Sequence, residues 1–237
     1  MTSLPPGREE PVVLVIAKAP APGRSKTRLA AAIGAVQAAA LARAMLLDTL
    51  DGCRLASSDV GIVCAADEDI PLLTEIVGPE APIVVQQGMG LSGALTTGAR
   101  HALSRGSAAL LVSSDIPGVP HGSLETAATL LGEGIDVVLG PGHDGGYWLL
   151  GLRAEHPELF VGMAWSTGNV LDATLSRCVD LNLVARLLEP WRDIDTEDDI
   201  AALDDLRDTL PGNRTRNALA QLSSAATAPT TPEVSTP

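Results

Sequence analysis

Residues 12–29 read VVLVIAKAPAPGRSKTRL, an apolar run that passes directly into a short basic segment. The run at residues 12–17 is continuous and rich in β-branched side chains, which predicts a strand buried on both faces of a parallel sheet. The segment that follows contains two prolines and one glycine, so it predicts a shaped loop rather than a helix interior. A helix is expected directly after this loop.

The loop at residues 18–28 concentrates positive charge. It carries four of the chain's 16 Lys and Arg residues, although the whole chain has 29 Asp and Glu residues and a net charge of −13. A strand, a loop and a helix N-terminus in this order offer backbone N–H groups, a positive helix end and fixed cations to a polyphosphate. A solvated basic turn is the alternative, but the acidic background favours a local anion site. The candidate phosphate contacts are Lys18, Gly23, Arg24, Lys26 and Arg28.

Two common phosphate-binding motifs do not fit this loop. Only one glycine precedes Ser25 and Lys26, so the loop lacks the G-x-x-x-x-G-K-[ST] pattern, and no G-x-G-x-x-G follows the strand. A P-loop nucleoside triphosphatase and a dinucleotide-binding dehydrogenase are therefore disfavoured.

The composition is that of an acidic globular protein. The 237 residues are 46% hydrophobic, enough for the core of one large α/β domain or two small ones, and only 2% are aromatic. The net charge of −13 argues against a nucleic-acid-binding protein, which would present a basic face. Cys53, Cys64 and Cys178 share no metal-type spacing and fit reduced thiols. Because no apolar signal region or membrane-length run is present, we expect a cytoplasmic protein.

The chain is expected to divide into a short extension, one domain and a tail. Residues 1–10 precede the first strand, residues 11–210 hold the alternating elements, and residues 211–237 become rich in Ser, Thr, Pro and Ala. This last composition cannot bury enough apolar area to offset the entropy of ordering. We therefore expect a disordered tail, whose removal after about Asn213 should leave stability and activity unchanged.

Strand patterns alternate with helix patterns along the domain. Apolar runs predict strands at residues 12–17, 59–65, 81–87, 108–112, 136–139 and 147–152. Helical patterns lie at residues 29–50, 70–77, 91–104, 123–131 and from about residue 169. This alternation predicts a single Rossmann-like, three-layer α/β/α domain with a mixed, mostly parallel central sheet and right-handed crossovers.

The fourth strand pattern ends in Ser113-Ser114-Asp115-Ile116-Pro117. A carboxylate at the carboxyl end of a core strand lies where ligands bind in open α/β sheets. An Asp before Pro can also be a turn or cap residue. The neighbouring phosphate loop favours metal ligation by Asp115, because Mg²⁺, or Mn²⁺ in its place, takes one or two carboxylates together with phosphate oxygens.

Residues 140–147, GPGHDGGY, place four glycines around one Asp and end in the only Tyr of the chain. So many glycines favour a close backbone approach to a ligand, although Asp-Gly is also an ordinary hairpin signal. The candidate contacts here are Asp144, Gly145, Gly146 and Tyr147. Gln87 and Leu91, between the third strand and the next helix, are further candidate nucleotide contacts.

Residues 191–200, WRDIDTEDDI, place several carboxylates around a helix start. Thr196 and Asp199 match a capping box with Asp in place of Glu or Gln, so Asp199 is expected to be structural. Asp193 and Asp195 precede the cap on one face of an extended segment, and one of them could complete the metal site.

Five segments carry a resemblance to a known superfamily. In order over roughly residues 12–206, they are AKAPAPGRSKTRLA, SSDIPGVP, GPGHDGGYWLLGL, AWSTGNV and RDIDTEDDI. They resemble the glycosyltransferase-like branch of the nucleotide-diphospho-sugar transferase superfamily, which has a GT-A fold and includes arsenosugar-biosynthesis glycosyltransferases. The KTRL, Asp-x-Pro and DIDT segments are also similar to 2-phospho-lactate and phosphoenolpyruvate guanylyltransferases, and more distantly to molybdenum-cofactor nucleotidyltransferases. The resemblance implies that Lys26 and Arg28 contact the phosphates. It further implies that Asp115 binds Mg²⁺ and that Asp195 is the second metal ligand.

The chain departs from the superfamily pattern at two places. Residues 90–95, GLSGAL, replace the usual Asp-Leu-Gly-Glu-Arg-Met, and Ser113-Ser114-Asp115 replaces Gly-x-Asp. The first departure puts the selection of base or sugar in question.

These observations favour an enzyme that uses a nucleotide. The first hypothesis is Mg²⁺-dependent nucleotidyl transfer from an NTP, with GTP as the first choice, to a small phosphorylated or acidic acceptor with release of pyrophosphate. Lys26, Arg28 and Asp115 would act by positioning and charge neutralisation, without a protein nucleophile. The alternative is glycosyl transfer from an NDP-sugar, although a loop with four cations and a single strand-end Asp favour a triphosphate. A nucleotide-binding module without catalysis is the third hypothesis. Trp165 could belong to the core or line the acceptor pocket. The sequence does not indicate an oligomeric state.

Overall fold

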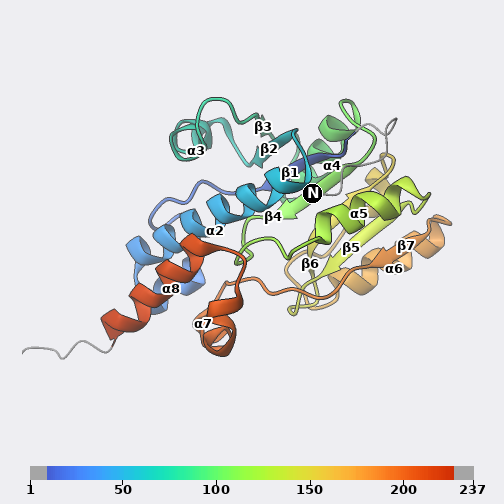
Figure 1. Cartoon of the computed structure of the whole chain (residues 1–237). Coiled ribbons are helices and arrows are strands. Elements are labelled where there is room, and N and C mark those ends of the chain that lie inside the picture. The colour runs from blue at the N-terminus through green and yellow to red at the C-terminus, as the bar shows by residue number, and fades with distance from the viewer. Residues whose placement is uncertain (1–9, 227–237) are drawn as a thin grey trace, which may run out of the picture.

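The computed structural model describes residues 10–226 and contains a seven-stranded sheet with helices on both faces (Figure 1). The strand order across the sheet is β3-β2-β1-β4-β6-β5-β7. The strands are β1 (Val12–Ile16), β2 (Val60–Cys64), β3 (Ile83–Val85), β4 (Ala109–Ser113), β5 (Val137–Pro141), β6 (Tyr147–Leu152) and β7 (Ala185–Leu187).

The sheet is mixed and mostly parallel, which confirms the fold predicted from the sequence. Strands β1, β2, β3 and β4 pair in parallel, as do β5 and β7, while β6 runs antiparallel to both β4 and β5. The carboxyl ends of the parallel strands and the start of β6 therefore meet at one edge of the sheet. Ligands of open α/β sheets bind at this edge.

The two faces of β1 show how the layers form. Val13 and Val15 pack in one apolar cluster with side chains of α2 (Ala35–Ala56), α3 (Ile70–Val77) and α5 (Ser123–Gly132). Val12 and Leu14 point the other way and pack with α4 (Gly90–Leu103) and α6 (Val170–Asp180). A continuous apolar run is thus what a strand covered on both faces requires.

The first predicted helix is broken into two. Helix α1 (Thr27–Ile33) ends at Gly34, and α2 starts at the next residue, whereas the sequence pattern predicted one helix over residues 29–50. Gly34 has a φ of +89°, a backbone conformation that glycine adopts without steric cost. The apolar spacing continues across this break, which is why the pattern did not reveal it.

The expectation of disorder from residue 211 is wrong for residues 213–226. These residues form α8 (Asn213–Ala226), which lies along α2 in Figure 1. Leu219 is buried in an apolar cluster with Leu41 and Met45 of α2. Residues 1–9 and 227–237, which include most of the predicted extension and the rest of the predicted tail, lie outside the described residues.

The remaining elements connect this framework. They are α7 (Glu197–Ala201) and three short 3₁₀ turns at Asp67–Asp69, Pro157–Leu159 and Asp204–Thr209. Strand β7 was not among the strands predicted from the sequence. None of the helices within residues 10–226 is long and apolar enough to cross a membrane.

Candidate functional site

A cleft of about 740 Å³ opens at the carboxyl edge of the sheet. Its walls come from the ends of β1, β2 and β4, the start of α4, the start of β6 and the loop around Trp165. Eight of the predicted site residues line it: Lys18, Arg24, Lys26, Arg28, Leu91, Asp115, Tyr147 and Asp195. The others, Gly23, Gln87, Asp144, Gly145 and Gly146, are not part of the lining.

Lys26 lies at the centre of the charged part of this cleft. Its side chain is only 3% exposed, and its Nζ lies 2.8 Å from Asp115 Oδ1 and 3.2 Å from Asp195 Oδ1. The two carboxylates that the sequence assigned to a metal therefore share one lysine ammonium. Lys26 is the N-cap residue of α1 and has a left-handed backbone with a φ of 49°, which is costly for a residue other than glycine.

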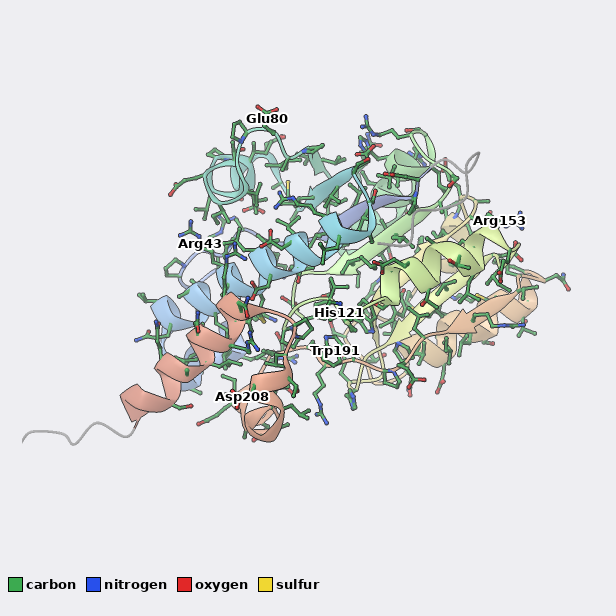
Figure 2. All side chains as sticks on the ribbon, viewed as in Figure 1. Arg43, Glu80, His121, Arg153, Trp191 and Asp208 are labelled. Atoms are coloured by element: carbon green, nitrogen blue, oxygen red, sulfur yellow. The ribbon has the colours of Figure 1, made fainter. Side chains whose placement is uncertain are left out.

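Backbone contacts hold Asp115 and Asp195 close to each other. The chain leaving β7 runs past the end of β5, where the Trp191 N–H donates to the Pro141 carbonyl at 2.9 Å; Figure 2 labels Trp191. Three residues later the Ile194 N–H donates to the Asp115 carbonyl, also at 2.9 Å. The segment thus passes from the end of β5 to the end of β4 and places Asp195 beside Asp115.

The helix cap predicted at Thr196 is confirmed. The Thr196 side chain accepts a hydrogen bond from the Asp199 N–H, and the Asp199 carboxylate accepts from the Thr196 N–H at 2.7 Å. The same carboxylate accepts from the Asp195 N–H at 2.9 Å. Asp199 is therefore structural, and it fixes the backbone of Asp195.

The other cations of the loop have different partners. The Arg24 guanidinium lies 3.0 Å from Asp69, whose side chain is 5% exposed, and 3.4 Å from Glu68, so it ties the loop to the turn after β2. The Arg28 side chain is 71% exposed and approaches Asp195 Oδ2 at 3.6 Å. Lys18 is exposed at the cleft. Arg28 and Lys18 are thus the cations of the loop that are most open to an incoming anion.

The residues present fit a divalent cation whose remaining ligands would come from the substrate and water. Asp115 and Asp195 supply carboxylate oxygens, which are the ligands that Mg²⁺ and Mn²⁺ prefer. Within the described part of the chain, no group of three or more His, Cys, Asp or Glu side chains could hold a metal by itself. Two carboxylates with phosphate oxygens and water would suit Mg²⁺. A metal bound here would compete with the Lys26 ammonium for the same two carboxylates.

Asp193 occupies a different environment from Asp195. Burial first, and the nearby Asp144 carboxylate second, raise the pKa of Asp193 from its ordinary value of 3.8 to about 6. Asp195, in contrast, pairs directly with Lys26 and Arg28. Of the two candidates for a second metal ligand, Asp195 is the one that shares a cation with Asp115.

The glycine-rich segment between β5 and β6 packs against the neighbouring loop. A Cβ on Gly145 would lie 2.1 Å from the carbonyl oxygen of Gly168, and the Asp144 carboxylate accepts the Gly146 N–H at 2.9 Å. The close backbone approach predicted for these glycines is therefore an approach to the loop around Trp165. A direct contact of Asp144, Gly145 and Gly146 with a nucleotide stays a prediction.

The turn between β3 and α4 brings Gln86, rather than Gln87, into the cleft lining. The Gln87 N–H instead donates to Thr97 Oγ1 at 2.7 Å, and Gly88 and Gly90 have φ values of 87° and 63°. Sequence reasoning also missed Ser166, a lining residue with a left-handed φ of 60°. No sequence signal separates Gln86 from Gln87, because the pair differs only in the direction that the turn gives each side chain.

Several known proteins resemble this chain in sequence or in fold. The profile of the family described as "Uncharacterized protein conserved in bacteria (DUF2064)" matches residues 49–167. A structure from Desulfovibrio desulfuricans G20, provisionally named a nucleotide-diphospho-sugar transferase, is 30% identical, has a TM-score of 0.81, and is matched over 90% of this chain and 95% of that chain.

More distant structures share the fold. The inositol-1-phosphate CTP transferase of T. maritima is 11% identical with a TM-score of 0.56, over 90% of this chain and 96% of its own. The 4-diphosphocytidyl-2C-methyl-D-erythritol synthase of Anaerococcus prevotii is 11% identical with a TM-score of 0.52, over 83% of this chain and 98% of its own. No curated protein sequence matches the chain.

Proposed function

Since the chain belongs to the DUF2064 family, within the nucleotide-diphospho-sugar transferase superfamily, we propose that it is a metal-assisted nucleotidyltransferase that transfers NMP from an NTP to a small acceptor. The structure that is 30% identical, provisionally named a nucleotide-diphospho-sugar transferase, supports a nucleotide-using transferase. The reaction, the metal and the base belong to the proposal, with GTP as the first nucleotide to test.

One observation carries the proposal: the ammonium of Lys26 lies between Asp115 and Asp195, at the carboxyl ends of β1 and β4. This cluster places a buried cation on Lys26, an exposed cation on Arg28 and two carboxylates along one wall of the cleft. The charges match a polyphosphate that carries its own divalent ion, because each carboxylate that a metal takes up frees the lysine for a phosphate oxygen.

The chemistry needs no protein nucleophile. An acceptor oxygen attacks the α-phosphorus and forms a new P–O bond, the bond from this phosphorus to the bridging oxygen breaks, and pyrophosphate leaves with the electron pair. The acceptor's proton passes to solvent. Lys26 and Arg28 stabilise the departing pyrophosphate by charge. Mg²⁺ held by Asp115 and Asp195 would neutralise charge on the phosphate oxygens.

Glycosyl transfer from an NDP-sugar is the second candidate. It is favoured by the provisional name of the relative that is 30% identical. The same groups would then stabilise a departing nucleoside diphosphate, and the two reactions differ in their products. Release of pyrophosphate from GTP supports the first reaction, whereas release of GDP from a GDP-sugar supports the second.

The first test is a calorimetric titration of GMP and GTP in Mg²⁺ at fixed ionic strength. If Lys26 and Arg28 hold the outer phosphates, replacing either residue with Ala should weaken GTP binding by about one to two decades, since a charge-assisted contact contributes roughly 1.5–3 kcal/mol. Binding of GMP should change much less. Arg28→Lys should restore only part of the loss, because a point charge cannot reproduce the guanidinium fork.

Arg54→Ala is the matched control, since it removes an exposed cation on α2 that pairs with Asp51 and does not line the cleft. It should bind both nucleotides like the parent. If the Lys26 and Arg28 variants lose equal affinity for GMP and GTP, or lose none, this loop does not bind the outer phosphates.

A further inference from the structure

Trp165 lies in a loop, but two linked hydrogen bonds and an aromatic contact fix its side chain. Its indole Nε1 donates to Ser92 Oγ at 2.7 Å, and the Ser92 hydroxyl donates to the Phe160 carbonyl at 2.9 Å. The two bonds tie the loop to the first turn of α4. Trp165 also meets Tyr147 edge to face, with ring centroids 6.4 Å apart and planes at 80°. Such contacts fix the plane of the indole without burying it completely.

Trp165 and Tyr147 continue into an apolar surface of the cleft. The lining residues beside them come from α4, which also carries Ser92. We call this surface the aromatic wall and define it by Leu91, Ala94, Leu95, Tyr147 and Trp165. Leu91 remains 39% exposed, so apolar area is open to an incoming molecule.

The wall is uncharged, in contrast to the rest of the cleft. Among the residues that the structure describes, every cation of the lining comes from residues 18–28, and the carboxylates of the lining are Asp115 and Asp195. Burial raises the pKa of Tyr147 above its ordinary value, so its phenol stays neutral. A phosphate or carboxylate group placed on this wall would lose water without gaining a cation, which is unfavourable.

We propose that the aromatic wall binds the second substrate and that this substrate is an uncharged, hydroxyl-bearing ring compound of the sugar or aryl-glycoside class. The apolar face of such a ring packs on Trp165 and Leu91, while its hydroxyl groups stay in the polar part of the cleft. This inference rests on the proposed function, because it assigns the nucleotide to the charged side of the cleft. It moves Leu91 and Tyr147, which the sequence suggested as nucleotide contacts, to the second substrate. It replaces the phosphorylated or acidic acceptor expected from the sequence with a neutral one.

A pair of probes that differ in charge tests the inference. Neutral p-nitrophenyl β-glucoside and anionic p-nitrophenyl phosphate carry the same nitrophenyl group, which quenches tryptophan fluorescence. Titrated into the parent protein in Mg²⁺ and saturating GTP, which occupies the charged side of the cleft, the neutral probe should quench saturably and bind at least tenfold more tightly than the anion. In the Trp165 variants, which lack the fluorescent reporter, binding is measured by calorimetric titration, and in Trp165→Leu the neutral probe should bind about tenfold or more weakly.

Three further variants separate binding from folding. Trp165→Phe keeps a ring but loses the bond to Ser92, so its affinity for the neutral probe should be intermediate, and Ser92→Ala, which loosens the same indole, should behave likewise. Val161→Ala alters an exposed neighbour outside the lining and should match the parent. Tighter binding of the anionic probe, or equal neutral-probe binding by the parent and all Trp165 variants, would overturn the inference.

A GTP titration of the parent in the same buffer distinguishes failure of the acceptor site from failure of the proposed function. If GTP binds and the neutral probe does not, the aromatic wall has another role and the proposed function stands. If GTP and NDP-sugars both fail to bind, the proposed function fails. The neutral probe then no longer reports on an acceptor, and the inference falls with it.

Discussion

Asp193 is one of several carboxylates around the start of α7, and burial gives it a raised pKa. Its pKa is raised to about 6, first by burial and then by the Asp144 carboxylate, with Lys26 acting in the opposite direction. The folded chain therefore keeps this proton between about pH 4 and pH 6, where the unfolded chain has released it. Because the folded state binds more protons in this window, its stability relative to the unfolded state falls as the pH rises through it.

Replacing Asp193 with Asn should remove that loss. We expect the parent to lose about 1 kcal/mol from this group between pH 4 and pH 6, a figure reduced for solvent screening because the side chain is partly exposed. The variant should therefore gain stability relative to the parent at pH 7 but not at pH 4. Urea unfolding at both pH values measures the difference.

Asp198→Asn serves as the control for Asp193, since Asp198 lies in the exposed first turn of α7. Its stability should follow the parent across the same pH range, apart from a small constant offset. Parallel pH profiles for the parent and Asp193→Asn would mean that the pKa of Asp193 is ordinary.

At the scale of single elements, α8 depends on one buried carboxylate of α2. The Asp48 side chain is 3% exposed. Its Oδ2 accepts from the Thr215 N–H at 2.7 Å and from the Thr215 hydroxyl at 2.8 Å, and its Oδ1 lies 3.1 Å from Arg214. A carboxylate at a helix N-terminus compensates its unpaired N–H groups and its positive dipole end.

Ending the chain at Gly212 should therefore destabilise the protein. Removal of α8 leaves Asp48 without these partners and exposes the cluster around Leu41 and Met45. Losing the burial of Leu219 costs about 1.5–3 kcal/mol, losing the charge-assisted bonds of Asp48 costs roughly 1.5–3 kcal/mol more, and each kcal/mol shifts the melting temperature of a chain of this size by roughly 2–4 °C. We expect a fall of roughly 10 °C in a thermal melt.

A chain ending at Ala226 keeps α8 and provides the comparison, so that the difference between the two truncations isolates this helix. Asp48→Asn keeps the side-chain shape but removes the charge, and it should produce an intermediate loss. If both truncated chains melt together, α8 does not contribute to the stability of the fold.

The same elements show how far the sequence can lead. The apolar runs of β1, β2 and β4 predicted their strands because a buried parallel strand has a continuous pattern. Strand β7 escaped notice because its three residues are too few for a pattern. Helix α8 was missed because its stability comes from Asp48 and from sparse contacts such as that of Leu219, not from its own composition.

The site, too, has features that the sequence could predict and features that it could not. Asp115 could be placed at the cleft because it follows a strand pattern, whereas the cap at Thr196 left Asp193 and Asp195 open and only the family resemblance chose Asp195. The shared ammonium of Lys26 could not be predicted, since it depends on the left-handed backbone of one residue and on a crossing segment distant in sequence. Arg24 was a candidate phosphate contact like Lys26, but its partner Asp69 comes from the turn after β2.

At the scale of the whole molecule, the cleft lies across the middle of the sheet. Its lining includes Ala42 and Leu46 of α2 on one face, and Leu91 and Leu95 of α4 on the other. A ligand bound here contacts both outer layers, so its binding energy should appear in global unfolding as well as locally. At 100 times its dissociation constant, such a ligand adds roughly 2.7 kcal/mol. Thermal unfolding can therefore report on the site of this acidic protein.

The arrangement of Lys26 predicts that metal and nucleotide bind cooperatively. Mg²⁺ alone must compete with an ammonium that already contacts both carboxylates, and GTP alone meets a lysine already engaged by them. When both are present, Asp115 and Asp195 would hold the metal, and the Lys26 ammonium would be free to contact the phosphates. Each ligand thus lowers the cost of binding the other, and the coupling must be equal in both directions. Mg²⁺ and GTP together should raise the melting temperature by more than the sum of their separate effects.

Lys26→Met tests this coupling directly, since it keeps a side chain of similar length in a buried position but removes the charge. Without the ammonium, Asp115 and Asp195 should bind Mg²⁺ about tenfold more tightly in the absence of nucleotide, which corresponds to about 1.4 kcal/mol. The variant should bind GTP more weakly, and the excess stabilisation by the two ligands together should largely disappear. Arg54→Met removes a cation outside the cleft and should keep the parent's coupling. Calorimetric titration of Mg²⁺ with and without GTP measures each quantity. If the parent and Lys26→Met bind Mg²⁺ alone with equal affinity, the lysine does not compete with the metal, and the two carboxylates are not its ligands.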